Sequence, residues 1–445
     1  MYSQFSIEQL VNGFRRGELC LDTWQQALRE RHGNAQHLNS FITFDPAMLA
    51  YVADADRQAP LYGLPVSFKD NINVLGMPTT AGTPGLADYL PQADAGIVAR
   101  FKQLGARVVG KNNMHELSFG VTSANHTHGA VINPTNERYS AGGSSGGCAA
   151  AVAAGLVPCA VGTDTGGSVR IPAAFCGIVG LRPTTGGYPA DGIVPVSQTK
   201  DTPGLLTRTV EDCRFVHGHL TAHHLPALPT NHPLRIGIPE RFLWSDLDDN
   251  VSRDCRAAID TLAASDVQIV PVDDSVIGEL NECIQFPLPI YEFFIDFPRF
   301  LMKEGRGAEF LDILARIEDP GIKKILTAQL ESPAISYTDY VQALMGKVRL
   351  EQEYRGLFTR HRLDLMAYPT VSCSAPLLED CAMESHFERF VRNTDPASNL
   401  AAPSITIPVA AADALPVGLS FDALPGQDGF LLQAVSRLAQ RLNIR

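Results

Sequence analysis

Glycine and serine are concentrated in one stretch of this 445-residue chain, and that stretch limits what the chain can fold into. Residues 142–192 contain 13 of the 37 glycines and hold two glycine-flanked serine clusters, Ser144-Ser145 and Ser168. Glycine lacks a Cβ, so it can adopt positive φ angles and bring the backbone close to a ligand. Successive N–H groups in such turns can converge on one anion. The segment therefore predicts close backbone packing around a site that offers serine hydroxyls and bare N–H groups.

The apolar pattern along the chain predicts an α/β protein. Short apolar strands alternate with helical stretches, which is typical of βαβ units and a largely parallel sheet. From about 275 to 362 the pattern turns helical and is rich in aromatic residues. We read residues 1–445 as a single domain with a helical, substrate-shaping insertion at about 275–362. The expected helices are two short ones within 6–32, then 94–104, 148–156, 249–265 and 427–442, and the expected strands are 63–69, 106–110, 159–162, 234–239, 267–272, 365–369, 404–409 and 416–421.

Composition restricts the partners and the compartment. The 48 acidic residues exceed the 36 basic ones and leave a net charge of −12, which argues against a broad nucleic-acid face. No apolar run reaches the roughly 18–20 residues that cross a bilayer, and the amino terminus lacks the apolar block of a signal peptide. The nine cysteines are scattered without a CxxC pair, which favours reduced thiols in a cytoplasmic protein. Cys148, Cys159 and Cys176 lie among small apolar residues and are predicted to be buried.

Ser168 and Lys69 are the candidates for nucleophilic chemistry. Ser168 follows two glycines, so its Oγ would lie beside N–H groups that can stabilise an oxyanion. The same residues could also form a plain Gly-Gly-Ser turn. Lys69 ends an apolar run, and burial there would lower its pKa from about 10.4 and make it a base. Alternatively, Lys69 is an ordinary lysine in water at the end of a strand.

Two other patterns fit their usual contexts poorly. Residues 143–147 match G-x-S-x-G with Ser145 at the centre, but the polar, turn-like residues 133–140 replace the strand that a nucleophile elbow requires. A histidine cluster at 217–224 has partial metal-ligand spacing: His217, His219, His223 and His224. No cysteine or carboxylate pattern completes a zinc set, so a solvated surface is the expected interpretation.

Three motifs resemble the amidase signature family: GGSSGG at 142–147, GTDTGGSVRIP at 162–172 and CGIVGLRPT at 176–184. The resemblance is densest from about Gly63 to Asp212 and resumes at 364–433. It implies a three-layer α/β/α fold with a central twisted mixed sheet flanked by helices. It also implies a hydrolase that needs neither a metal nor an organic cofactor.

The resemblance implies a Ser–cis-Ser–Lys triad. Ser168 would be the nucleophile, Ser144 would be the bridging serine in a cis peptide, and Lys69 would be the neutral base. A hydroxyl both accepts and donates a hydrogen bond, so the bridging serine could pass a proton between the other two groups.

Further residues take supporting roles by the same resemblance. The backbone N–H groups of Thr165, Gly166 and Gly167, with that of Ser168, would form the oxyanion hole. A charged pair, Asp164 and Arg170, would hold the loop without reacting. Residues 114–123 border the active site in members of the family.

The substrate is implied less sharply than the reaction. Residues 188–203, 392–408 and 415–421 look most like indoleacetamide and mandelamide hydrolases. We therefore expect an arylacetamide to be hydrolysed to a carboxylate and ammonia. A small ureido substrate of the carboxybiuret or allophanate type is one alternative, and a glutaminase subunit of a tRNA-dependent amidotransferase is another. The aromatic residues of 275–362 could line an acyl pocket or form ordinary core, and a homodimer is an assembly that the sequence leaves open.

Overall fold

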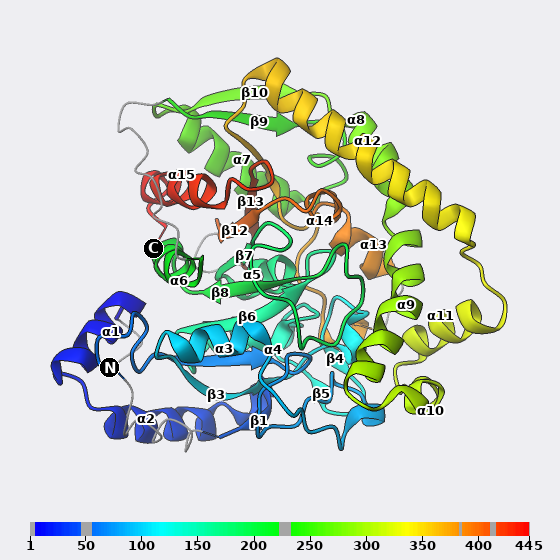
Figure 1. Ribbon diagram of the computed structural model, residues 1–445. Helices are drawn as coiled ribbons and strands as arrows, with labels where there is room; N and C mark the ends of the chain where they lie inside the picture. The colour runs from blue at the N-terminus through cyan, green and yellow to red at the C-terminus, as the bar shows by residue number, and fades with distance from the viewer. Residues whose placement is uncertain (1–4, 46–55, 222–232, 382–384, 410–414, 445) are drawn as a thin grey trace.

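A mixed sheet of 11 strands runs through the centre of the part of the chain that the structure describes (Figure 1). The computed structural model describes residues 5–45, 56–221, 233–381, 385–409 and 415–444. The strand order is β1-β3-β2-β6-β8-β7-β12-β13-β11-β9-β10. The strands are β1 Phe41–Phe44, β2 Pro65–Lys69, β3 Arg107–Asn112, β6 Cys159–Asp164, β7 Val179–Arg182, β8 Thr202–Thr207, β9 Arg235–Pro239, β10 Gln268–Val272, β11 Leu365–Pro369, β12 Ser404–Pro408 and β13 Gly418–Asp422, and a separate small pair is β4 Ala124–Asn125 with β5 Gly129–Ala130.

The strand directions correct one expectation and confirm another. Neighbouring strands are parallel in β3-β2-β6 and in β11-β9-β10, but the strands between these groups, from β6 through β8, β7, β12 and β13 to β11, pair antiparallel. The prediction of a largely parallel sheet is therefore wrong for the centre of the sheet, and the prediction of a mixed sheet is confirmed. Residues 183–201 link β7 to β8 without a helix. Antiparallel neighbours need no crossover helix, so the alternation of strands and helices breaks there.

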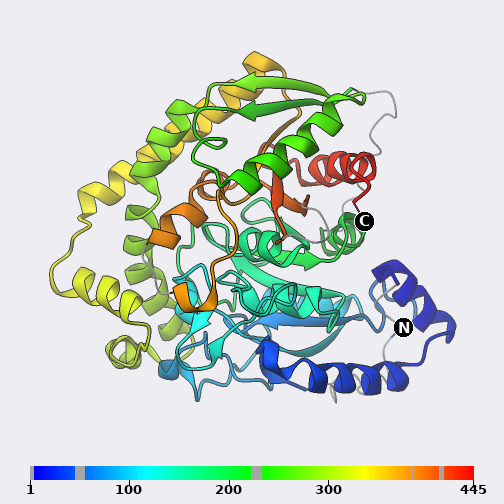
Figure 2. The same ribbon diagram turned by 180° about the vertical axis from the view of Figure 1, so that it is seen from behind.

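Helices cover both faces of the sheet, which gives the expected three layers (Figures 1 and 2). On one face, β-strand side chains share a hydrophobic core with α3, α6, α7 and α15. On the other face, α2, α4 and α5 form a second core. The helices are α1 Ile7–Arg16, α2 Leu21–Asn34, α3 Gly96–Gln103, α4 Gly146–Ala153, α5 Arg170–Cys176, α6 Val210–Thr221, α7 Asp249–Ala263, α8 Ser275–Ile284, α9 Pro287–Lys303, α10 Phe310–Ala315, α11 Pro320–Glu331, α12 Tyr337–His361, α13 Ser385–Val391, α14 Asp395–Asn399 and α15 Asp428–Arg441.

Helix α4 places the first serine cluster. Its sequence, GGCAAAVA, consists of small and apolar residues, and nearly all of them are fully buried. Small side chains let α4 approach β2, β6 and α5 closely. Cys148 is buried in this helix, as predicted, and so are Cys159 and Cys176 elsewhere. The start of α4 therefore lies against the end of β2 and the end of β6.

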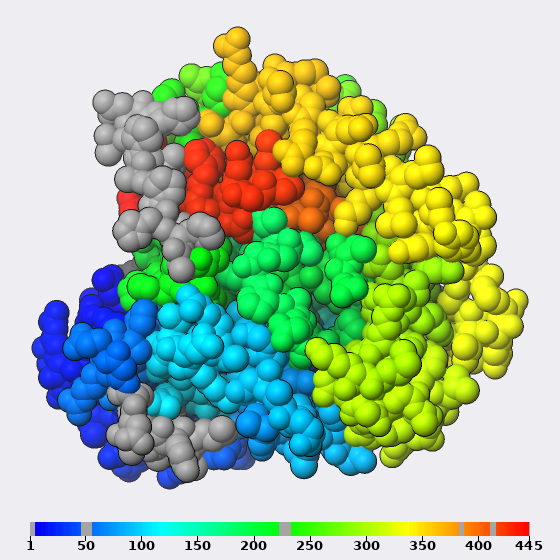
Figure 3. Space-filling view, viewed as in Figure 1, coloured from blue at the N-terminus to red at the C-terminus, as the bar shows by residue number. Residues whose placement is uncertain are grey.

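The segment from α8 to α12 is helical, as expected. In Figure 3 it covers one side of the molecule, where it is coloured yellow-green to gold. Phe293 and Phe297 are fully buried in a cluster with Leu86 and Leu117, whereas Phe119 is only partly buried against that cluster. The buried aromatic residues of α9 thus serve as core. Across the described residues, no helix combines the length and the hydropathy that a membrane span needs.

Candidate active site

Lys69 lies at the end of β2 and is completely buried. Side chains alternate along a strand, and Val66 and Phe68 enter the core with α3, so Lys69 faces the side that carries α4. Its Nζ donates to Ser144 Oγ at 2.8 Å and to Thr163 Oγ1 at 2.8 Å. Burial lowers the pKa of Lys69 from 10.5 to about 7, because desolvation disfavours the ammonium form. A lysine in water at a strand end is therefore the wrong interpretation.

Ser144 is fully buried and follows a cis peptide bond to Gly143. Its carbonyl oxygen accepts hydrogen bonds from His115 N at 3.1 Å and from Ser123 Oγ at 3.3 Å. Ser123 Oγ also accepts from Gly146 N at 3.0 Å. Residues 114–123 thus form the wall that holds Ser144 in place.

Ser168 lies beside the first serine cluster. Its carbonyl oxygen accepts from Ser145 N at 3.1 Å, and the residue as a whole is 7% exposed. Within the described residues, Ser168 Oγ makes no hydrogen bond, whereas Ser144 Oγ is held by Lys69. The fold therefore brings Lys69, Ser144 and the backbone of residue 168 to one place.

Ser145 has a structural role. It is fully buried, its Oγ donates to Thr163 O at 3.2 Å, and the same oxygen accepts from Thr163 N at 3.3 Å. No strand leads into it, because residues 133–144 are turns and isolated bridges. The nucleophile-elbow interpretation is therefore wrong.

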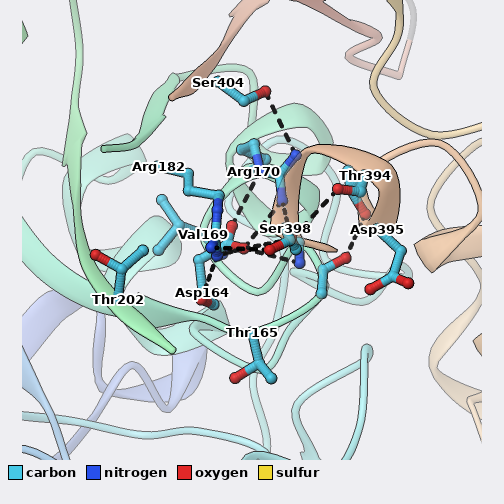
Figure 4. A network of polar contacts seen from close by, with 12 residues as sticks. Asp164, Thr165, Val169, Arg170, Arg182, Thr202, Thr394, Asp395, Ser398 and Ser404 are labelled. Carbon is cyan, nitrogen blue, oxygen red and sulfur yellow. Dashed lines mark hydrogen bonds and ion pairs between the residues drawn. The ribbon is translucent and has the colours of Figure 1, made fainter. Parts of the chain in front are cut away.

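Asp164 is the centre of a buried ionic network (Figure 4). Arg170 donates to both carboxylate oxygens at 2.9 and 3.1 Å, as the expected supporting pair requires, and Arg182 Nη1 donates to Oδ1 at 3.0 Å. Burial alone would raise the pKa of Asp164, but the two guanidinium groups outweigh it and hold that pKa well below its usual range. Ser398 Oγ accepts from Arg170 at 2.8 Å. The sequence motifs contain Arg182, but they did not indicate that Arg182 is a partner of Asp164.

The oxyanion loop differs from the expectation at Gly167. Its N–H donates to Asp164 Oδ1 at 3.0 Å, so this donor is already engaged. Within the described residues, the N–H groups of Thr165, Gly166 and Ser168 carry no hydrogen bond. Gly167 has a φ of +133°, and a Cβ there would collide with Thr394 Oγ1, so the position requires glycine.

Two polar residues near Lys69 escaped the sequence-based interpretation. Asn71 Nδ2 donates to Thr163 Oγ1 at 3.2 Å and comes within 3.4 Å of Ser118 Oγ. Both Asn71 and Thr163 are buried at strand ends, and that position is the signal that could have singled them out.

We predict that Asp164→Asn destabilises the protein strongly. Removing one partner of a buried ion pair leaves uncompensated charge, which typically costs about 3–5 kcal/mol. The pKa of Asp164 is lower in the folded state, so its stabilising effect is complete at neutral pH and is lost only as the pH falls through that depressed value. Urea unfolding at pH 7 measures the change.

Glu351→Gln is the matched control for this prediction. Glu351 forms an exposed pair with Arg355 at 2.9 Å, and such pairs contribute about 0.5 kcal/mol or less. An unchanged unfolding midpoint for Asp164→Asn would contradict the claim that the ion pairs of Asp164 with Arg170 and Arg182 stabilise the fold.

The histidines of 217–221 do not form a metal centre in the described structure. His217 Nδ1 shares a hydrogen bond with Tyr188 OH at 2.7 Å, and the ring of His219 packs against Phe215. His223 and His224 lie outside the described residues. Among the residues that are described, no three histidine, cysteine or carboxylate side chains gather as metal ligands.

This chain has sequence relatives that match it over nearly its full length. The amidase family model matches residues 24–432. The indoleacetamide hydrolase of Pseudomonas savastanoi is 45% identical over 446 residues, which cover 99% of this chain and 98% of that protein. The indoleacetamide hydrolase of Pseudomonas syringae pv. syringae is 46% identical, with 99% and 100% covered.

Solved structures share the fold over nearly the whole chain. The peptide amidase of Stenotrophomonas maltophilia superposes with a TM-score of 0.84 at 27% identity, covering 100% of this chain and 98% of that one. A second solved amidase has a TM-score of 0.86 at 29% identity, with 98% and 100% covered. The chain therefore belongs to the amidase family and is an amidohydrolase that acts on C–N bonds.

Proposed function

We propose that this chain hydrolyses an arylacetamide, such as indoleacetamide or mandelamide, to a carboxylate and ammonia. Ser168 Oγ attacks the amide carbonyl, and its proton passes to Ser144 Oγ while Ser144 passes its own proton to Lys69. The proton then returns along the same path to the departing ammonia, and water cleaves the acyl-enzyme. The 2.8 Å hydrogen bond between Lys69 Nζ and Ser144 Oγ carries this proposal.

The state of Lys69 supports its role as the base. With a pKa of about 7, roughly half of Lys69 is neutral at pH 7 and can accept a proton. The free N–H groups of Thr165, Gly166 and Ser168 supply donors for the oxyanion that forms on the carbonyl oxygen. Histidine is not needed, because serine–lysine arrangements perform the same exchange of protons.

The choice of substrate rests on two observations. The full-length relatives at 45% and 46% identity are indoleacetamide hydrolases. An acidic ureido substrate would need a free cation near Ser168. Among the cations around residues 164–168 in the described chain, Arg170 and Arg182 share Asp164, Lys200 pairs with Asp395 at 2.7 Å, and Lys69 is engaged as the proposed base. A neutral amide therefore fits better.

Ammonia release from a substrate panel tests the proposal. We expect the purified chain to release ammonia from indole-3-acetamide, phenylacetamide and mandelamide, and much more slowly from allophanate or glutamine. Faster turnover of allophanate would favour the ureido alternative. Activity on glutamine alone, and only with added partner subunits, would favour the amidotransferase alternative.

A further inference from the structure

Asp201 connects the proposed oxyanion loop to the segment before β8. Its Oδ1 accepts from Thr165 Oγ1 at 2.5 Å, and its Oδ2 accepts from Val196 N at 2.8 Å and Ser197 N at 3.0 Å. Burial raises the pKa of Asp201 to about 6, so it still accepts as a carboxylate at neutral pH. One side chain thus ties the orientation of Thr165 to the position of residues 196–201.

Glu292 of α9 holds the same segment from the other side. It is 3% exposed, and its Oε2 accepts from Ser197 Oγ at 2.5 Å and from Thr199 Oγ1 at 2.9 Å. Its Oε1 accepts from Tyr340 OH of α12 at 3.2 Å. A long, buried carboxylate with this many donors is a rigid anchor, because moving the segment would leave it unpaired.

Neighbouring contacts reinforce the anchor. Asp296, one turn along α9, accepts from Gln198 N at 2.8 Å, and Lys347 of α12 donates to Thr199 O at 2.9 Å. Four consecutive residues, 197–200, are therefore each held by a side chain or carbonyl contact, the last through the ion pair of Lys200 with Asp395. The helices of 275–361 reach the oxyanion loop through this segment and also through α14, where Asn399 Nδ2 donates to Asn281 Oδ1 of α8 at 2.8 Å and Thr394 Oγ1 donates to Gly166 O at 2.5 Å.

We propose that Glu292 is a positioning residue for amide hydrolysis: through residues 196–201 and Asp201, it fixes Thr165 and so aims the backbone donors of the oxyanion hole. The helical segment from α8 to α12 thereby controls the rate of the chemical step. This inference rests on the proposed role of Ser168. We call this series of contacts, from Glu292 through residues 196–201 and Asp201 to Thr165, the relay. The relay holds Thr165 by its hydroxyl, so the hydroxyl is needed even though it is the backbone N–H of Thr165 that meets the oxyanion.

The relay predicts which variants lose rate in the chemical step and which keep it. Losing or misaiming an oxyanion donor typically costs about 10²–10³-fold in rate, and a partly misaimed one about tenfold or more. Glu292→Leu and Thr165→Val should fall in this range. Glu292→Gln keeps an acceptor oxygen on a side chain of the same length, and Thr165→Ser keeps the hydroxyl. The rates of both variants should therefore stay within about threefold of the rate of the unmodified chain.

Phosphonylation of Ser168 by an alkyl fluorophosphonate measures the effect without any assumption about the acyl group. Ser168 Oγ forms a bond to phosphorus, the P–F bond breaks, fluoride leaves, and the serine proton passes through Ser144 to Lys69. The phosphoryl oxygen takes the place of the oxyanion. Mass spectrometry locates the adduct, and the concentration dependence of the rate separates the maximal rate from reagent affinity.

We expect Glu292→Leu and Thr165→Val to lower the maximal labelling rate, with reagent affinity unchanged. The acidic limb of the pH profile reports Lys69, and Glu292→Leu should leave it in place. Thr165→Val removes a hydrogen bond that lowers the pKa of Asp201, and the charge of Asp201 raises the pKa of Lys69, so the limb is compared for Glu292→Leu alone. Asp212→Leu is the matched control, because Asp212 is a buried carboxylate on α6 whose Oδ1 accepts from Ile7 N at 2.6 Å, in the amino-terminal part of the chain. It should label at the normal rate.

A folded Glu292→Leu that labels at the normal rate would overturn the inference, and so would an equal loss in Asp212→Leu. If Glu292→Leu fails to fold, Thr165→Val against Thr165→Ser decides the matter in the same way. An unmodified chain that does not label at Ser168 would overturn the proposed function, and the relay with it. Normal labelling at Ser168 with no effect of the variants would overturn the relay alone.

Discussion

Replacing Ser168 with alanine should abolish amide hydrolysis while the protein stays folded. Removal of the nucleophile of a serine hydrolase typically lowers kcat by about 10⁴-fold or more, because no other group can form the acyl-enzyme. Ser168 Oγ makes no hydrogen bond to the described residues, so the alanine variant loses no hydrogen bond within that part of the folded chain. Ammonia release from indole-3-acetamide measures the activity, and the melting temperature shows that the fold is intact.

Ser145→Ala is the control for this experiment. Ser145 precedes α4, and its hydroxyl bonds both the N–H and the carbonyl of Thr163. We expect the alanine variant to be less stable by about 1–3 kcal/mol, because buried backbone groups lose a partner, yet to keep measurable turnover. Substantial activity in Ser168→Ala together with its loss in Ser145→Ala would show that the nucleophile is misassigned.

Replacing Lys69 with methionine should remove most of the activity and leave a stable protein. General-base catalysis typically contributes about 10²–10⁴-fold, and methionine has the length of lysine without a basic nitrogen. The unfolded chain holds a proton on Lys69 up to a pH of about 10, whereas the folded chain releases it near 7, so burial of this lysine opposes folding most at pH 7 and below. The methionine variant should therefore melt no lower than the unmodified chain, and its advantage should shrink as the pH rises toward 10.

The pH profile of the unmodified chain is a second test of Lys69 as the base. Only neutral Lys69 accepts a proton, so kcat/KM should fall tenfold for each pH unit below about 7 and should level off above it. Initial rates between pH 5 and 9 define the limb. A rate that stays constant down to about pH 5 would exclude a neutral lysine as the base.

The local motifs predicted which groups take part, but not all of the partners that hold them. Ser144 and Ser168 lie in glycine-rich turns, and Asp164 ends the strand that leads into the second of them; this composition already indicated close backbone approach. Gly167 shows the limit of that reasoning: its N–H was expected to face an oxyanion, and it donates to Asp164 instead. Which direction an N–H takes in a glycine turn depends on the carboxylate that competes for it, and composition does not encode that.

Contacts between residues far apart in the sequence could not be predicted from local motifs or apolar periodicity. Glu292 meets Ser197 across 95 residues, and Arg182 meets the 398–404 region only because β7 pairs with β12. The antiparallel pairing of β7 with β8 accompanies the helix-free connection 183–201, which apolar periodicity did not reveal. Strand order decides these contacts, and strand order is a property of the whole chain.

By itself, the sequence determined the chemical groups of the site: a lysine at the end of an apolar strand and two glycine-flanked serines, on a chain with an α/β pattern. Only the tertiary structure decided that Lys69 is buried with no carboxylate of the described residues in contact with it, which lowers its pKa to about 7 and lets it meet Ser144 at 2.8 Å. The reason is physical: a side chain's basicity depends on the water and charges that the fold removes or brings near, and those come from residues far away along the chain.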